Sequence, residues 1–64
     1  MAYFAVNKNG EEVVFNYEPS RSSSWWEVFD YYSPTDYGVT LPKHTIFQLI
    51  GRNLTWEDEP YLYD

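Results

Sequence analysis

The sequence predicts a small α+β domain in which an antiparallel sheet carries one short helix packed on a face. Three observations favour this class: an Asn-Gly pair between two apolar runs, a segment dense in aromatic and β-branched residues, and a capping box followed by an apolar stripe at helical spacing. The expected order along the chain is ββββαβ. At 64 residues the chain is near the lower size limit for independent folding, so we assign residues 1–64 to a single small domain.

The first expected element is a β-hairpin. Apolar runs at residues 3–6 and 13–15 flank the Asn-Gly pair, in which both residues tolerate the positive φ of a tight turn. A two-residue turn would place Val6 opposite Val13 and gather the apolar side chains on one face. A three-residue loop would shift the pairing by one residue and set Glu12 against Val6. We prefer the first register.

The next stretch predicts a loop followed by a third strand. Residues 18–24 are polar and Ser-rich with one Pro, which is typical of a mobile loop. Residues 25–32 are dense in aromatic and β-branched side chains, which favour a strand. Because successive side chains of a strand point to opposite faces, one of its two Trp and one of its two adjacent Tyr should face away from the core.

Two further strands are expected in the second half of the chain, one before the predicted helix and one after it. Residues 33–38 have the composition of a turn, and residues 39–41 follow as a short fourth strand that Pro42 ends. Residues 54–56 resemble a last strand. Pro60 cannot donate to a sheet ladder and would confine its segment to an edge.

The single helix is expected to start at Thr45 and to run for about two turns. Thr45 and Gln48 match a capping box, in which each side chain satisfies a free backbone N–H. Gly51 stands where a left-handed C-terminal cap is needed. The apolar stripe comprises Ile46, Leu49 and Ile50. Phe47 lies off this stripe and should be at least half exposed.

Composition narrows the classes of function. Ten acidic residues against four basic ones give a net charge of −6, which opposes direct binding to nucleic acid and to anionic membranes. A basic surface on another protein, such as one that holds nucleic acid, is the complementary partner. No Cys is present, and we expect neither a secretion leader nor a membrane span, so the expected location is the cytoplasm.

Catalytic residues are poorly represented, and we expect no enzyme activity. The chain has one His, at position 44, and its Ser run lacks the sharp turn that presents a nucleophile. Carboxylate pairs such as Asp30 with Asp36 would need a concave pocket that separates their pKa values. No phosphate-binding Gly loop or calcium-loop pattern occurs, so no cofactor or metal is expected.

The aromatic content, 22% of the residues, exceeds what the core of so short a chain can enclose. Part of it packs the core, and the remainder is a candidate binding surface because Trp and Tyr are enriched at interface hot spots. Acidic residues near the C-terminus either contribute to that surface or keep the chain soluble. The candidate partner-binding residues are Trp25, Trp26, Tyr31, Tyr32, Phe47, Glu57, Asp58, Glu59, Tyr61 and Tyr63.

About a third of the chain resembles a class of short proteins encoded by bacteriophages and prophages. The segments that carry the resemblance are LPK at 41–43, LIGR at 49–52 and LTWEDEP at 54–60, with weaker support from the hairpin tip at 7–11. The chain departs from that pattern at His44, where the pattern has Gly, and at Phe47, where it has a polar residue. The resemblance implies a protein that binds a host protein and redirects or blocks it, including effector complexes of CRISPR and other defence systems.

Three functions therefore remain in competition. The first is an anti-CRISPR-like inhibitor of a host complex, acting through an acidic-aromatic surface. The second is a structural or assembly accessory that hides its aromatics in self-contacts, with no inhibitory role. The third is an enzyme with a metal site on carboxylates. We favour the inhibitor.

Overall fold

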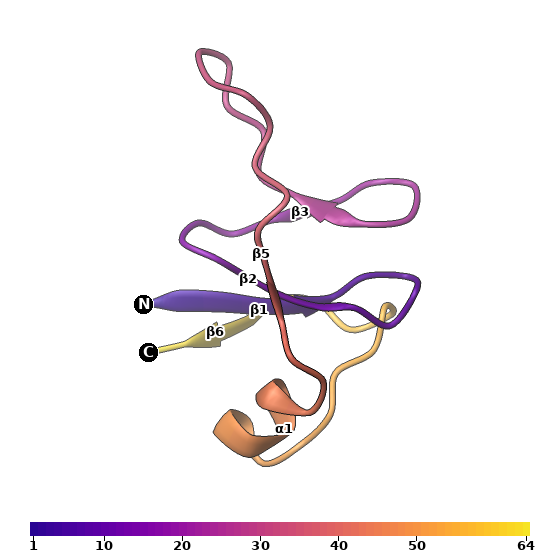
Figure 1. Ribbon diagram of the computed structural model, residues 1–64. Helices are drawn as coiled ribbons and strands as arrows, with labels where there is room; N and C mark the ends of the chain where they lie inside the picture. Colours follow the sequence, from indigo (N-terminus) through magenta and orange to yellow (C-terminus); the bar gives the residue numbers. More distant parts are fainter.

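Two antiparallel sheets and one helix form the fold, which confirms the expected α+β class (Figure 1). The computed structural model describes all residues, 1–64. The elements are β1 Ala2–Val6, β2 Glu12–Phe15, β3 Ser20–Arg21, β4 Trp26–Glu27, β5 Val39–Leu41, α1 Thr45–Ile50 and β6 Tyr61–Tyr63. The main sheet has the order β5-β2-β1-β6, and β3 pairs only with β4. The chain thus has one strand more than the expected order.

The hairpin of β1 and β2 forms as expected, but in the register that we did not prefer. Val6 lies opposite Glu12, and Phe4 lies opposite Val14. The loop holds three residues, because the backbone N–H of Asn7 donates to the carbonyl of Glu11 at 2.8 Å. Gly10 closes this loop at φ 91°, the left-handed position that a three-residue hairpin loop requires. The two-residue turn was therefore wrong, although the glycine has the positive φ anticipated for it.

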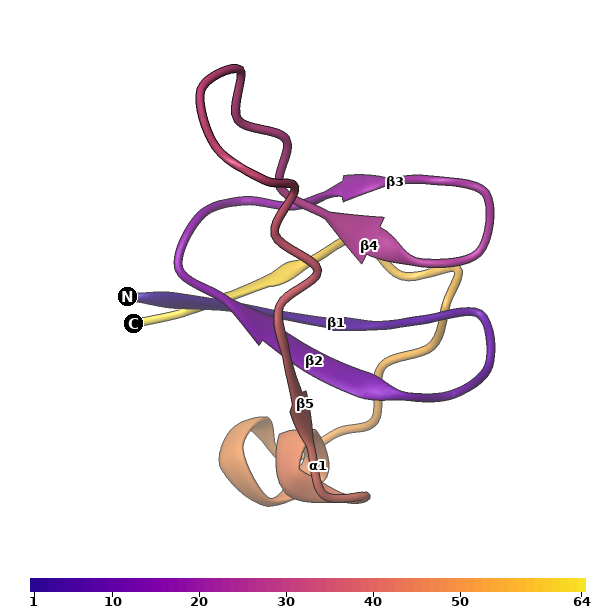
Figure 2. The ribbon, with the colours of Figure 1, turned by 45° about the horizontal axis from the view of Figure 1, so that its top comes forward.

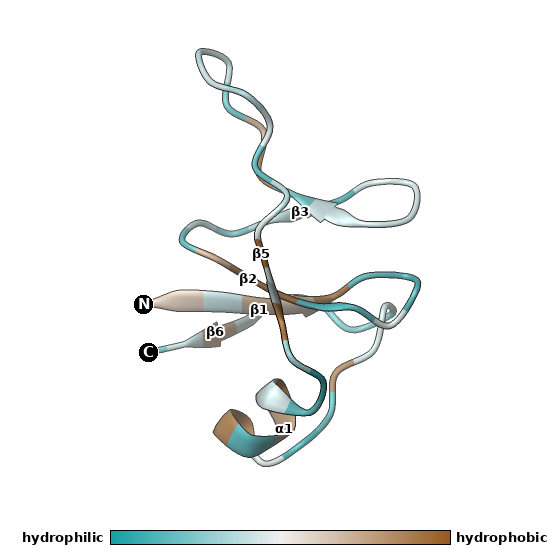
Figure 3. Cartoon of the chain, viewed as in Figure 1, coloured by the Kyte–Doolittle hydropathy of each residue, from teal (hydrophilic) through white to brown (hydrophobic).

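The observed register gives the central strands two buried faces. Phe4 and Val6 point toward α1 and pack with Ile46 and Leu54. The opposite face carries Ala5, Val13 and Phe15, which pack around Trp26 of β4. Figure 2 shows the resulting layers, with the β3–β4 hairpin on one side of the main sheet and α1 on the other. Figure 3 shows hydrophobic residues along β1 and β2, where the two cores meet the sheet.

The segment expected to form a long third strand is mostly not a strand. Only Trp26 and Glu27 pair, and their partners are Ser20 and Arg21, within the expected loop. The alternation expected for the two Trp holds, since Trp26 is 2% exposed and Trp25 is 37% exposed. β4 ends at Glu27. Val28 pairs with Asp36, and the chain between them leaves the small sheet and turns back on itself (Figure 1).

The start of α1 is capped by a distant residue and not by the expected capping box. The N-cap position is His44 and not Thr45, whose hydroxyl donates to the carbonyl of Pro42 at 2.6 Å, while the N–H of Gln48 donates to the carbonyl of His44 at 3.1 Å. Glu12 of β2 instead accepts the backbone N–H groups of His44 at 2.7 Å and Ile46 at 2.9 Å. His44 itself has no side-chain capping bond. A carboxylate at a helix start also interacts favourably with the positive end of the helix dipole.

The apolar stripe of α1 is narrower than expected. Ile46 is 1% exposed and Ile50 packs against the same core, but Leu49 is 46% exposed and lies outside it. The contact with the core is made by Ile46 and Ile50, which are one helical turn apart, and Leu49 stays on the exposed side of the helix. Phe47 is 48% exposed, as expected. Gly51 ends the helix at φ 80° and donates its N–H to Phe47, which confirms the predicted C-terminal cap.

The last strand lies later in the chain than predicted. Residues 54–56 form no strand, and Leu54 instead inserts its side chain, 7% exposed, into the core below the sheet. The strand is β6, which pairs with β1 through Tyr61 opposite Phe4. It occupies an edge of the sheet, directly after Pro60, as the proline predicts. The fourth strand, β5, lies at the opposite edge and has the predicted bounds.

Arg21 joins the small sheet to the turn that precedes β6. Its guanidinium lies 4.6 Å from the ring centroid of Trp26 and 5.1 Å from that of Trp56. The same group donates to the carbonyl oxygen of Trp56 at 2.9 Å. Trp26 and Trp56 in turn meet edge to face at 5.7 Å. A cation–π contact with Trp56 and two hydrogen bonds, to the carbonyl oxygens of Trp56 and Asp58, thus hold β3 against a segment far away in the chain.

Candidate partner-binding surface

A protruding loop, here called the finger and comprising residues 28–38, carries half of the exposed aromatic side chains. Figures 1 and 2 show it rising beyond the β3–β4 hairpin, away from both cores. Its base is closed by two backbone hydrogen bonds between Val28 and Asp36, at 2.8 and 3.0 Å. The base therefore has the geometry of an antiparallel pair and holds the finger to the folded domain.

Four aromatic rings of the finger are exposed. The exposed fractions are 71% for Phe29, 82% for Tyr31, 92% for Tyr32 and 56% for Tyr37. The rings of Tyr31 and Tyr32 contact each other edge to face at a centroid distance of 5.2 Å. The expectation that one of these two Tyr faces inward is therefore wrong, because they lie in a turn where strand alternation does not apply. Exposed rings on one loop form an apolar surface that a partner can cover.

The carboxylates of the finger shape its backbone and set its charge. Asp30 accepts the N–H of Tyr32 at 3.0 Å, and Asp36 accepts the N–H of Gly38 at 2.8 Å. Such bonds to a backbone two residues ahead are the reason that Asp is common in turns. The finger contains no Lys, Arg or His, so its exposed rings are accompanied only by negative charge.

The second leg of the finger returns to the sheet through a tight contact at Gly38. This residue has φ 79°, and a Cβ built on it would lie 2.8 Å from the Phe15 ring, closer than side chains allow. Only glycine fits a position that is both left-handed and pressed against the core. Beside this leg, Tyr37 meets Trp25 edge to face at 6.2 Å. The base of the finger is thus packed, while its tip is exposed.

The other predicted aromatic residues are dispersed over the molecule. Trp26 lies in the core, where its indole N–H donates to the carbonyl of Val6 at 2.9 Å, so it is not available to a partner. Tyr61 is half-buried under Arg52, and Tyr63 packs on Phe4 at 5.2 Å on the helix side of the sheet. Phe47 is half exposed on α1, so these residues do not join the finger.

The acidic residues near the C-terminus form a turn that is separate from the finger. Asp58 is committed to that turn, because its carboxylate accepts the N–H of Thr55 at 2.7 Å. Glu57 and Glu59 are exposed. Figures 1 and 2 place this turn, just before β6, on another part of the molecule from the finger tip. The predicted acidic and aromatic residues therefore do not make one continuous patch.

Sequence reasoning missed four residues of the finger: Phe29, Asp30, Asp36 and Tyr37. The sequence places Phe29 in a predicted strand and Tyr37 in a predicted turn, and it offers the two aspartates only as a catalytic pair. The signal that was present is the turn composition of residues 33–38, because aromatic side chains in or beside a turn need not follow strand alternation. The acidic and aromatic residues that the structure brings together are those of the finger.

Other kinds of site receive little support from the geometry. No group of three or more His, Asp or Glu side chains is arranged to hold a metal ion. The only helix, α1, has six residues, and no helix is long and apolar enough to cross a membrane. Comparison with known proteins finds no family model, no curated protein and no solved structure that matches this chain.

Proposed function

We propose that this protein acts by binding another protein, with the finger as its docking element. The observation that carries the proposal is the set of four rings exposed on one loop whose base is held by hydrogen bonds. In a chain of this size, leaving such rings in water forgoes burial worth about 1.5–3 kcal/mol per side chain. A partner surface that covers them recovers this energy, and the closed base limits the entropy lost on binding.

The charge of the finger and of the whole chain indicates the kind of partner. The finger carries Asp30 and Asp36 without any basic residue, and the chain carries a net charge of −6. A partner surface rich in Arg is complementary to both the carboxylates and the exposed rings of the finger. Guanidinium groups pair with carboxylates and also stack on aromatic rings. Surfaces that hold nucleic acid are the commonest of this type.

The specific form of the proposal is an inhibitor of a host complex. The resemblance to phage-encoded proteins supplies this context, and occupation of a basic nucleic-acid-binding surface would be the inhibitory step, in the bacterial cytoplasm. The protein would act without catalysis or a cofactor. Defence effectors of the CRISPR type are suitable targets, because they hold RNA and DNA in positively charged channels.

The proposal is tested by affinity capture from a bacterial lysate that carries defence systems. The tagged wild-type chain and a Tyr31→Ser/Tyr32→Ser variant serve as baits at low and moderate salt, with mass spectrometry as the readout. We expect the wild type to retain one basic complex in stoichiometric amount, and the variant to lose it. Because these two side chains are more than 80% exposed, the variant should fold normally.

A matched control separates the finger from general surface effects. Phe47→Ser removes an exposed aromatic ring from α1 and should leave the capture unchanged. Raising the salt should weaken the complex, since part of its energy comes from exposed charges. Capture of the same complex by the finger variant would refute the finger as the docking element. Recovery of the chain only with itself, together with a multimer in light scattering, would favour the self-assembling accessory instead.

A further inference from the structure

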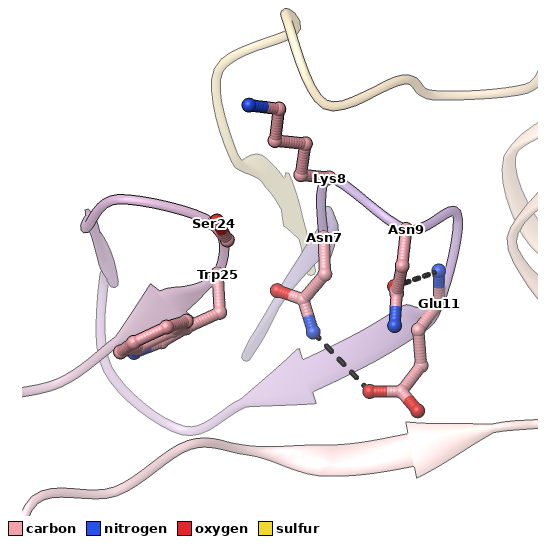
Figure 4. A pocket seen from close by; sticks show the side chains of 6 residues that line it. All are labelled: Asn7, Lys8, Asn9, Glu11, Ser24 and Trp25. Atoms are coloured by element: carbon pink, nitrogen blue, oxygen red, sulfur yellow. Dashed lines mark hydrogen bonds between the residues drawn. The ribbon is translucent and has the colours of Figure 1, made fainter.

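A polar hollow lies beside the base of the finger, between the β1–β2 loop and the turn that precedes β4. Its volume is about 400 Å³, within the range of sites for small molecules. Trp25 is its only apolar wall, and the other lining residues are Asn7, Lys8, Asn9, Glu11 and Ser24. In Figure 4 the Trp25 ring lies on one side and Asn9 with Glu11 on the other. Asn7 stands between them, only 8% exposed, as the floor.

The walls of this hollow are held in place by bonds that need no ligand. The backbone N–H of Lys8 donates to the carbonyl of Ser24 at 3.1 Å, which ties the two loops together. The Asn7 side chain accepts the N–H of Trp26 at 2.9 Å and donates to Glu11 at 3.3 Å. Side chains already fixed in one rotamer lose little entropy when a ligand binds.

Two further bonds orient the groups that face each other across the hollow. The Asn9 side-chain oxygen accepts the N–H of Glu11 at 2.9 Å, which leaves its NH₂ group as a free donor (Figure 4). The indole N–H of Trp25 donates to Glu27 at 2.9 Å, and its ring also rests on Tyr37. Trp25 is 37% exposed, so part of the residue remains open to solvent while the ring is held.

The remaining hydrogen-bonding groups favour a ligand that both donates and accepts hydrogen bonds. The free donors are the NH₂ of Asn9 and the hydroxyl of Ser24, and the free acceptors are the same hydroxyl and one oxygen of the Glu11 carboxylate, while the Lys8 side chain extends away from Asn7, Asn9 and Glu11 (Figure 4). A guanidinium or ammonium group could pair with Glu11, but it has donors only and would leave the free NH₂ of Asn9 without an acceptor. A phosphate or carboxylate would meet the charge of Glu11. Hydroxyl groups both donate and accept, so a neutral polyhydroxylated ligand matches the whole set.

From this inventory we propose that the hollow is a carbohydrate-binding site. The C–H face of a pyranose ring stacks on the open face of Trp25. Its hydroxyls accept from Asn9 and donate to Glu11. The inference does not depend on the finger, since none of the finger's residues lines the hollow.

Nuclear magnetic resonance of the ¹⁵N-labelled protein tests the site directly. The probes are D-glucose, D-galactose, N-acetyl-D-glucosamine and their short oligomers, with arginine amide and inorganic phosphate as charged counterparts. We expect at least one sugar to shift the indole N–H signal of Trp25 and the side-chain amide signals of Asn9 saturably. The charged probes should not do so.

Two variants identify the groups that bind. Trp25→Ala should lower the affinity about tenfold or more, because it removes the stacking surface. Asn9→Asp keeps the oxygen that accepts the Glu11 N–H but replaces the free donor with a carboxylate oxygen. It should therefore weaken sugar binding by about tenfold while the hairpin signals stay in place. Tyr32→Ala is the control, because it removes a ring from the finger and none from the hollow.

The outcomes separate this site from the finger. Sugar binding that survives in Tyr32→Ala and is lost in Trp25→Ala supports the carbohydrate site, whatever the protein capture shows. No saturable shift with any sugar or oligomer would overturn it. Saturation by arginine amide at lower concentration than by any sugar would also overturn it, and would assign the hollow to a basic side chain of a partner.

Discussion

The carboxylate of Glu12, on the helix-facing side of β2, accepts the backbone N–H of Ile46 at 2.9 Å, across 34 positions of the sequence. Its second oxygen accepts the N–H of His44. A helix of six residues has no stability of its own in water. Glu12 therefore contributes to the formation of α1 by satisfying two N–H groups at its start that have no partner within the helix.

Glu12→Gln should destabilise the protein by about 1 kcal/mol, because an amide retains only one acceptor oxygen and carries no charge toward the helix start. Urea unfolding followed by Trp fluorescence measures the change. Glu59→Gln is the matched control, since Glu59 is exposed and should give a change near zero. Equal effects of the two substitutions would show that the Glu12 cap contributes nothing in solution.

His44→Gly should stabilise the protein, by up to about 1 kcal/mol. His44 is the only non-glycine residue with positive φ, at 73°, a conformation that costs a side-chain-bearing residue energy. Thr45→Gly, one residue later within α1, should instead destabilise. A lower melting temperature for His44→Gly would contradict the strain at this position.

Gly38→Ala should destabilise the protein by more than the same change at Gly51. Both residues have φ near 80°, so both pay the conformational cost of an added Cβ. Only at Gly38 would the Cβ also collide with the Phe15 ring, at 2.8 Å, whereas nothing lies within 4 Å at Gly51. Thermal unfolding of the two variants measures the difference. Equal melting temperatures would mean that Phe15 moves aside without loss.

Ile46→Ala should destabilise the protein by about 2–5 kcal/mol, enough to prevent folding in a domain of this size. Its side chain is 1% exposed and lies at the centre of the core beneath the sheet. Leu49→Ala should cost less than about 1 kcal/mol, because Leu49 is 46% exposed. Circular dichroism during urea unfolding compares the two. A larger loss of stability for Leu49→Ala than for Ile46→Ala would mean that Leu49 belongs to the core-facing stripe, as the sequence predicts.

The elements that could be predicted are those that depend on neighbouring residues. The β1–β2 hairpin follows from Asn-Gly between apolar runs, the end of β5 from Pro42, and the end of α1 from Gly51. In each case one residue type restricts its own backbone, so the information is local. The same is true of the exposure of Phe47, which follows from helical spacing.

The register of the hairpin could not be predicted, because it depends on what covers each face. A one-residue shift exchanges the two faces of a strand. Counting apolar residues for one buried face favoured the wrong register. The observed one is favoured because Trp26 covers one face and Ile46 the other, and both come from distant parts of the chain.

The candidate sites also combine features that could be predicted from the sequence with features that could not. The surplus of exposed aromatic side chains was evident from composition, since so short a chain cannot enclose so many rings. Their location was not, because strand alternation fails where residues 28–38 leave the sheet, and the acidic turn before β6 lies elsewhere. The hollow beside Trp25 was not anticipated, since it arises only where the hairpin loop meets the turn before β4.

By itself the sequence determined the fold class, the turns at its glycines and prolines, the acidic charge and the excess of aromatic residues. Tertiary structure alone decided the register, the cap on α1, the position of β6 and the set of side chains that meet at the finger and the hollow. The physical reason is the range along the chain over which each kind of interaction acts. Backbone preferences act within a few residues, whereas burial and the satisfaction of polar groups are settled by contacts between segments far apart in the chain.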